Sequence, residues 1–155
     1  MSDKPSSSHR NDTDVNTDEH RIFLHKDLTY KIIGFVYEIR KEYGPGHKEN
    51  VYGNLLAELL DKESINYEKE KNIIFYSKYG TKVGTYRPDF IVDNKIILEL
   101  KSASITLKQD ELQMYRYLRN SKYEIAYLIN FSTPRIYIKR IIYTNDRKPF
   151  LRDSV

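Results

Sequence analysis

Residues 86–101 read Tyr-Arg-Pro-Asp-Phe-Ile-Val-Asp-Asn-Lys-Ile-Ile-Leu-Glu-Leu-Lys and predict a β-hairpin. Two apolar runs, residues 90–92 and 96–100, flank the polar segment 93–95. Apolar, β-branched runs on both sides of a short polar segment are typical of two antiparallel strands joined by a turn. Unlike plain core strands, both runs end in charged residues.

The length of the turn decides which face of the hairpin Asp89 joins. Side chains alternate between faces along a strand, so Glu99 and Lys101 share one face. A three-residue loop at 93–95 places Asp89 opposite Glu99 on that face. A two-residue loop would move Asp89 to the other face, because a shift of one residue flips every side chain. We therefore predict an odd-numbered loop, or a bulge with the same effect.

Asp89 and Glu99 predict a metal site if they lie side by side. Neighbouring carboxylates repel, and each is hard to keep ionised without a counter-charge. Hard oxygen ligands favour Mg²⁺ or Mn²⁺ as that counter-charge. Lys101, on the same face, could then steer a water or stabilise negative charge developing at phosphorus. The alternative is a surface hairpin with a Glu–Lys ion pair of little energetic value.

The motif Pro88-Asp89, followed by Glu99-Leu100-Lys101, resembles the signature of the PD-(D/E)XK nuclease superfamily. Residues 46–52, Gly-His-Lys-Glu-Asn-Val-Tyr, fit the Gly-x-x-Glu-x-x-Tyr motif that names one family within it. Residues 113–117, Gln-Met-Tyr-Arg-Tyr, fit the Gln-x-x-x-Tyr motif of RecB-like members. The motifs occur in the superfamily's order, and the resemblance covers about 28–143. It implies a restriction-endonuclease-like core and metal-dependent hydrolysis of phosphodiester bonds.

The resemblance also implies roles for particular residues. Glu49, Asp89 and Glu99 would hold Mg²⁺ or Mn²⁺, helped by the backbone carbonyl of Leu100, and Lys101 would complete the catalytic set. Glu49 has a structural alternative, because a glutamate in the first turn of a helix is favoured by the helix dipole by about 0.3–1 kcal/mol.

Three further residues would flank this site. Gln113 and Tyr117 are four residues apart on a predicted helix, so they lie on one face. They would bind a phosphate or a water ligand of the metal, and the alternative is a surface pair. Tyr52 lies three residues after Glu49, and it would either orient that carboxylate or pack in the core.

Five strands and three helices give an α+β fold with a mixed sheet flanked by helices. The helices are expected at 28–43, 48–65 and 106–120, the last with Thr106 and Gln109 spaced as a capping box. Strands at 68–79, 82–92 and 96–101 form a three-stranded antiparallel meander, and further strands follow at 123–130 and 135–143. The run 125–129 is apolar on both faces, which suits a parallel strand covered by helices. Pro88 cannot donate a ladder hydrogen bond, so we expect pairing to break there.

We predict a domain at 23–144, between a polar, acidic disordered tail at 1–22 and a flexible end at 145–155. At 155 residues the chain can build a single core. It has no cysteine, no apolar run long enough to span a bilayer and no hydrophobic signal region. We therefore expect an intracellular protein, in the cytoplasm, nucleoid or nucleus, that is neither secreted nor membrane-bound. The oligomeric state stays open, a homo-oligomer included.

A basic domain can favour a nucleic-acid partner, but ordinary solubility charge would give the same pattern, and DNA is the substrate expected from the nuclease resemblance. Net charge is +4, and acidic residues concentrate near the N-terminus, so the domain itself is more basic. On the last predicted strand, Arg135, Tyr137 and Lys139 share a face that could meet phosphates and bases. Such charges also serve to protect a sheet edge from further pairing. Besides a nuclease, the sequence allows a catalytically silent nuclease fold that binds or organises nucleic acid, or that serves as a subunit of a larger assembly. A basic domain that binds a protein partner is a third reading.

Overall fold

The computed structural model describes residues 24–149 and confirms the expected α+β class. The helices are α2 (Lys26–Tyr43), α3 (Glu49–Lys62), α4 (Lys108–Arg119) and the 3-10 helix η1 (Asn145–Arg147). The strands are β1 (Tyr67–Lys69), β2 (Ile73–Tyr76), β3 (Lys82–Tyr86), β4 (Phe90–Val92), β5 (Ile96–Lys101), β6 (Ile125–Asn130) and β7 (Tyr137–Ile142). None of the helices in the described part of the chain is long and apolar enough to cross a membrane.

Five strands form one mixed sheet in the order β1-β4-β5-β6-β7. The β5–β6 pair is parallel, and the other three pairs in this sheet are antiparallel. Every residue of β6 is buried, as is typical of a parallel strand covered on both faces. The prediction of such a strand at 123–130 is therefore confirmed.

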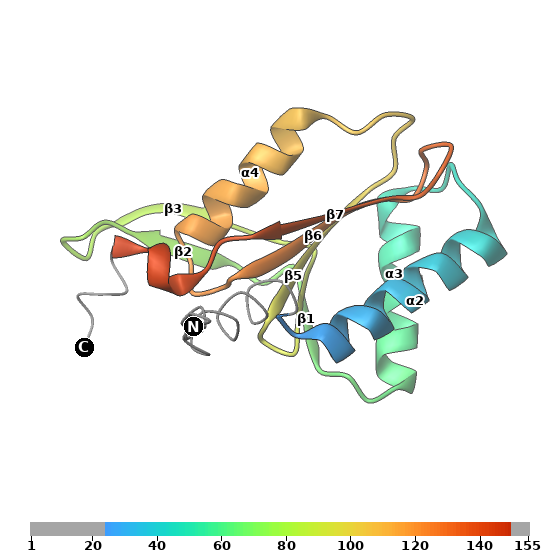
Figure 1. The fold of residues 1–155 in the computed structure, drawn as a ribbon, viewed down its shortest axis with the longest axis horizontal. Helices are drawn as coiled ribbons and strands as arrows, with labels where there is room; N and C mark the ends of the chain where they lie inside the picture. The colour runs from blue at the N-terminus through green and yellow to red at the C-terminus, as the bar shows by residue number, and fades with distance from the viewer. Residues whose placement is uncertain (1–23, 150–155) are drawn as a thin grey trace, which may run out of the picture.

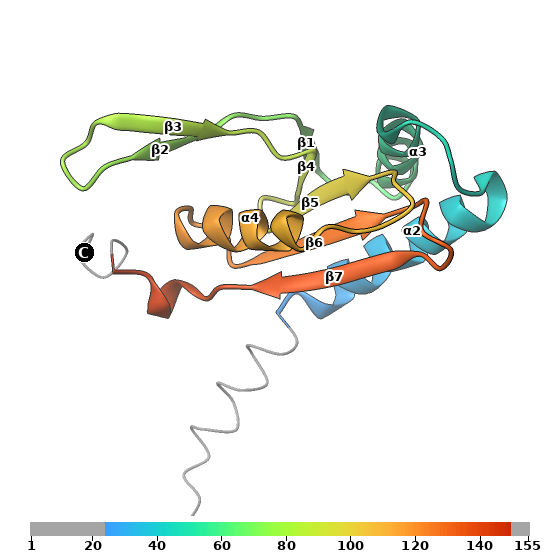
Figure 2. The ribbon, with the colours of Figure 1, turned by 90° about the horizontal axis from the view of Figure 1, so that it is seen from above.

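Helices cover both faces of this sheet (Figure 2). On one face, apolar side chains of α2 and α3, such as Val36 and Leu56, join a core with Leu98 of β5. On the other face, Met114 of α4 packs in a second core with Ile97 of β5. Because Leu98 and Ile97 are adjacent, alternation assigns Glu99 and Lys101 to the α4 face.

The β4–β5 turn has the effect that the sequence predicts. Val92 pairs with Ile96, which leaves residues 93–95 as a three-residue connection. Asp93 and Asn94 both have positive φ, 50° and 51°, and the N–H of Lys95 donates to the carbonyl of Val92 at 3.0 Å. Two consecutive left-handed residues are characteristic of a type I′ turn, which Asn and Asp tolerate. Lys95 is then one extra residue, a bulge, and the prediction of an odd-numbered loop is confirmed.

The predicted strands 68–79 and 82–92 are not continuous, so this part of the prediction is wrong. The first divides into β1 and β2, and the second into β3 and β4, with β1 pairing β4 and β2 pairing β3. The break contains Pro88, which has no N–H for a ladder bond. Arg87 lies in the same break, and its Nε donates to the Glu70 carbonyl at 2.9 Å.

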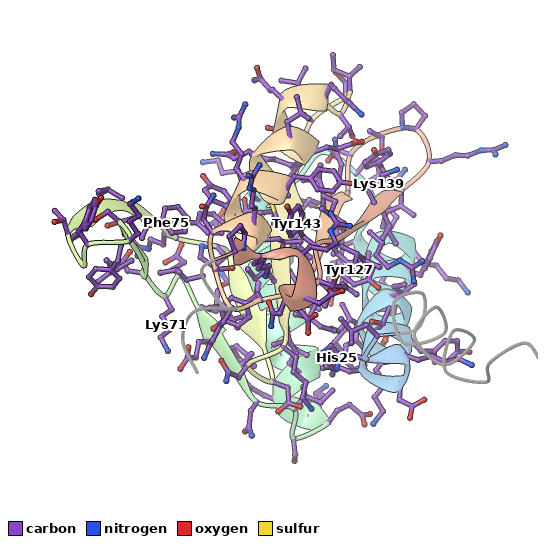
Figure 3. All side chains as sticks on the ribbon, turned by 60° about the vertical axis from the view of Figure 1, so that its left-hand side comes forward. His25, Lys71, Phe75, Tyr127, Lys139 and Tyr143 are labelled. Atoms are coloured by element: carbon purple, nitrogen blue, oxygen red, sulfur yellow. The ribbon has the colours of Figure 1, made fainter. Side chains whose placement is uncertain are left out.

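Beyond this break, β2 and β3 form a separate two-stranded ribbon that projects from the body (Figures 1 and 2). We call residues 71–86 the arm. Figure 3 shows Phe75 on the arm, well away from Lys139 and Tyr143 on the body. The ring of Phe75 lies 6.1 Å from that of Tyr117 on α4, so the arm is supported at its base.

The C-terminal end of the described chain is attached to the domain. Residue 145 was predicted to begin a flexible end, yet η1 forms there and Lys148 is fully buried. The Lys148 ammonium donates to the carbonyls of Ser121 and Tyr123 at 2.9 and 2.7 Å and to Asn145 Oδ1 at 2.7 Å. Burial lowers the pKa of Lys148 to about 8. The predicted tail at 1–22 and residues 150–155 lie outside the described residues.

Candidate active site

Asp89 and Glu99 lie side by side on the α4 face of the sheet. Phe90 pairs with Leu98 in the antiparallel β4–β5 ladder. In the same register, the next position places Asp89 opposite Glu99. The backbone N–H of Asp89 donates to Glu99 Oε1 at 3.2 Å, and the N–H of Leu100 donates to Asp89 Oδ2 at 2.7 Å. The structure thus brings together the two carboxylates that the sequence predicts as neighbours.

Burial and mutual repulsion make both carboxylates hard to ionise. Burial raises the pKa of Glu99 to about 7, and the charge of Asp89 adds to the shift. Burial also raises the pKa of Asp89, and the charge of Glu49 acts in the same direction. The folded chain therefore holds two acids whose ionised form lacks a sufficient counter-charge.

One oxygen of each carboxylate is left without a hydrogen bond. Asp89 Oδ2 and Glu99 Oε1 are taken by the backbone donors, whereas Asp89 Oδ1 and Glu99 Oε2 have no partner among residues 24–149. Two unpartnered oxygens on neighbouring carboxylates suit a hard divalent cation, which would supply the missing positive charge.

The Leu100 carbonyl adds a third oxygen to this edge. The carbonyl of Lys101 accepts from the backbone N–H of Phe131, so it points to the β6 side of β5. Because successive carbonyls of a strand point to opposite sides, the Leu100 carbonyl points to the β4 side. There its antiparallel counterpart would be Pro88, which has no N–H to donate. The carbonyl therefore lies near Asp89 without a ladder donor, in keeping with its predicted role as a metal ligand.

Glu49 is nearby but does not join the pair. It is exposed in the first turn of α3, and its charge reaches Asp89. Within residues 24–149, no three His, Cys, Asp or Glu side chains are grouped closely enough to hold a metal. The predicted acidic triad is thus, in the structure, a pair with a third carboxylate at longer range.

Lys101 lies on the same face as the pair and faces α4. Its ammonium is 4.0 Å from Asp110 Oδ1, in the first turn of that helix. Burial and the charge of Asp89 raise the pKa of Glu99, and the charge of Lys101 opposes them with a smaller effect that lowers it. Asp110 was not predicted, because its contact with Lys101 is a tertiary one that no local pattern reveals.

An aromatic pair covers the other side of Glu99. The Tyr86 hydroxyl donates to Glu99 Oε1 at 3.1 Å, and its ring stacks on Tyr117 with centroids 3.2 Å apart. Gln113 in turn donates to the Tyr117 hydroxyl. The two predicted flanking residues of α4 are therefore adjacent to the carboxylates, through Tyr86.

Sequence reasoning missed Tyr86 for an identifiable reason. In an uninterrupted strand, Tyr86 and Asp89 are an odd number of residues apart and would lie on opposite faces. The break at 87–89 removes that alternation and lets both residues contact Glu99. Pro88 was the available signal, since it already predicted an interruption.

A model of the PD-(D/E)XK nuclease superfamily matches residues 26–141, and these residues contain the whole of the site just described. The chain belongs to the PD-(D/E)XK nuclease superfamily. Nucleases of this superfamily generally use divalent metals. Membership of the Gly-x-x-Glu-x-x-Tyr family within it stays a prediction.

A search of solved structures supports the fold assignment. The chain is similar to the crystal structure of SSO0001, with a TM-score of 0.50 and 22% sequence identity. The match covers 67% of this chain and 55% of that chain, so this domain corresponds to about half of the other protein. The comparison with curated proteins found no match.

Tyr52, the last residue of the Gly-x-x-Glu-x-x-Tyr segment, is fully buried. Its ring stacks on Phe131 with centroids 4.3 Å apart, and its hydroxyl donates to the Gly44 carbonyl at 2.6 Å. The hydroxyl also accepts from the N–H of His47 at 3.2 Å. Of the two predicted roles, packing is the one its contacts support, and it fixes the loop that leads to Glu49.

A cleft of about 480 Å³ opens between the loop that leads into α3 and the loop that follows β5. It is lined by residues 45–48, 102–104 and Ser132, which adjoin Glu49 and Lys101 in sequence. The Gly46 N–H donates to Ser132 Oγ at 2.9 Å, and the Ser102 and Ser132 hydroxyls lie 2.6 Å apart. The lining contains Lys48 but no carboxylate, so its charge suits a phosphate-bearing strand.

The predicted nucleic-acid face on β7 is only partly available. The Tyr137 hydroxyl donates to Glu111, and this bond raises the pKa of Tyr137 to about 12. Arg135 and Lys139 are exposed. A role for this face therefore rests on two basic side chains rather than three residues, and it stays a prediction.

Titration of Glu99 is expected to destabilise the metal-free protein as pH rises from 5 to 8. The pKa of Glu99 is about 7 in the folded state, above its ordinary value of 4.5. Between these values the folded chain binds more protons than the unfolded chain, so the free energy of unfolding falls with rising pH, by about 3 kcal/mol at most. Thermal unfolding in EDTA at both pH values should show a smaller difference for Glu99→Gln. An equal difference in this variant would contradict the assignment.

Proposed function

We propose that this protein is a divalent-metal-dependent nuclease that hydrolyses phosphodiester bonds, with DNA as its substrate. The observation that carries the proposal is the pair Asp89 and Glu99, each with one unpartnered oxygen, beside the ammonium of Lys101. Paired carboxylates with a lysine on the same face are the residue types that metal-assisted phosphoryl chemistry needs.

Each residue has a defined task in this proposal. Asp89, Glu99 and the Leu100 carbonyl would hold Mg²⁺ or Mn²⁺, with Glu49 contributing charge from α3. A bound metal supplies an acidified water and polarises the scissile phosphate. Lys101 positions that water or neutralises the charge that develops on phosphorus.

The flanking residues keep the carboxylates in place. Tyr86 donates to Glu99 Oε1, so Oε2 would be the oxygen that Glu99 offers to a metal. Tyr117 and Gln113 support Tyr86 from α4. The cleft lined by Lys48 and Ser104 gives the substrate backbone a path without carboxylates.

A second candidate is a silent nuclease fold that binds nucleic acid without cutting it, alone or as a subunit of a larger assembly. The position of Glu49 favours the silent fold, because among the described residues no third acidic side chain joins Asp89 and Glu99 closely enough to hold a metal. Turnover is the property that distinguishes this candidate from the nuclease.

The test is incubation of supercoiled plasmid, linear duplex, single-stranded DNA and RNA with the full chain in Mg²⁺, Mn²⁺ or EDTA. The nuclease proposal expects nicked or shortened DNA with either metal and intact DNA in EDTA. Intact substrates under every metal condition, together with a mobility shift that shows binding, would favour the silent fold.

A further inference from the structure

The charged side chains of the arm, residues 71–86, are all positive. The arm contains Lys71, Lys78 and Lys82 and no aspartate or glutamate. Lys71 is paired with Glu68 at 2.8 Å, outside the arm. Lys78 lies 5.1 Å from the centre of the Tyr79 ring, and Lys82 forms no ion pair within residues 24–149. Two ammonium groups near the tip are thus available to an anionic partner.

The arm also exposes apolar and aromatic side chains to solvent. Alternation places Ile73 and Phe75 toward α4, while Ile74 and Tyr76 face outward. At the tip, Tyr79 is 83% exposed. Exposed aromatic and basic side chains on one projecting ribbon are the combination that contacts phosphates, sugars and bases.

The shape of the arm selects one form of nucleic acid. The major groove of B-form DNA, about 12 Å wide, admits a two-stranded β-ribbon. The major groove of A-form RNA is deep and narrow, and side chains cannot read it. From Tyr86 to Lys82 strand β3 extends roughly 13 Å at 3.3 Å per residue, a distance of about four base-pair steps, and the turn at the tip lies beyond it.

We propose that the arm enters the major groove of duplex DNA and that duplex DNA is therefore the substrate form. This inference rests on the proposed nuclease function and deepens it. Lys78 and Lys82 contact phosphates at the groove edges, and Tyr79 contacts the groove surface. The root of the arm is Tyr86, whose hydroxyl binds Glu99, so a duplex held by the arm passes beside the carboxylate pair.

The test measures binding of a fluorescent 20-base-pair DNA duplex by anisotropy, in EDTA, between 50 and 200 mM salt. The full chain is compared with the double variant Lys78→Ala, Lys82→Ala. The affinity constant K falls as salt rises, and each lost phosphate contact makes the slope of log K against log salt less steep by about 0.9. For the double variant we expect the magnitude of this slope to decrease by about 2 and the affinity at 100 mM salt to fall about tenfold or more.

Two controls make the result specific. The double variant Lys31→Ala, Lys41→Ala removes the same charge from α2, on the other side of the sheet, and should leave affinity within about twofold. An RNA duplex of the same sequence should bind more weakly, with a slope that the arm variant leaves unchanged. Thermal unfolding should be the same for all variants, since these lysines are exposed.

An unchanged DNA slope in the arm variant, or an equal loss on RNA or single-stranded DNA, would overturn the inference. Because these measurements contain no metal, they do not depend on cleavage. Failure of the nuclease proposal would instead appear in the plasmid assay, with the arm's contribution to binding intact.

Discussion

Replacing Asp89 by asparagine is expected to lower the cleavage rate about a thousandfold or more. The change removes one of the two charges that would hold the metal, and losses of 10²–10³ are usual even for a single electrostatic contact in a catalytic site. The amide oxygen can still accept from the Leu100 N–H, so the β4–β5 edge should keep its geometry. Plasmid cleavage in Mg²⁺ and calorimetric titration with Mn²⁺ measure the two effects.

The matched control is Asp93→Asn, the same change four residues away in the turn of the same hairpin. Asp93 is paired with Lys95 at 3.1 Å and has positive φ, which asparagine tolerates. This variant should cut and bind Mn²⁺ as the parent does. The metal-free Asp89→Asn protein should be at least as stable as the parent, because a repulsion with Glu99 is lost. Undiminished cleavage by Asp89→Asn would refute the metal site.

Replacing Lys101 by methionine is expected to lower cleavage about a hundredfold or more while leaving Mn²⁺ binding in place. Methionine keeps the apolar stem but removes the ammonium that lies beside the carboxylates and 4.0 Å from Asp110. If Lys101 acts on water or on phosphorus, its loss affects the rate and spares metal capture. Single-turnover cleavage and Mn²⁺ calorimetry on the same preparation separate the two quantities.

Lys95→Met is the control for this second variant, since Lys95 is an exposed lysine of the same hairpin. It should show parent-like cleavage. If Lys101→Met instead loses Mn²⁺ binding together with activity, Lys101 serves to organise the carboxylates rather than the reaction. Equal rates for Lys101→Met and the parent would remove Lys101 from the catalytic set.

The hairpin could be predicted because its determinants are local. Two apolar runs set its strands, and Asp93-Asn94 supplied a turn that adopts positive φ. The position of Asp89 opposite Glu99 followed from counting residues. The same counting could not have found Tyr86, because the break at Pro88 removes the regular alternation on which counting depends.

Contacts between distant elements were beyond the reach of sequence patterns. Thr106 was predicted to cap α4, yet the helix begins after Leu107 without a side-chain cap, and Thr106 Oγ1 accepts from Asn130 at the end of β6 instead. Asp110 and Lys101 meet only because α4 packs against the sheet on the face that Lys101 occupies. The separation of Glu49 from the carboxylate pair likewise depends on how α3 docks, which the motif alone does not determine.

Pro88 has a consequence for how such a domain could lose activity during evolution. Any other residue at this position would bring a backbone N–H that could close the ladder onto the carbonyl of Leu100. A neutral substitution at residue 88 could in this way remove the carbonyl from the proposed metal site while every acidic and basic side chain is retained. A scan for intact charged motifs would still score such a descendant as active, so the residue before the aspartate has to be read together with them.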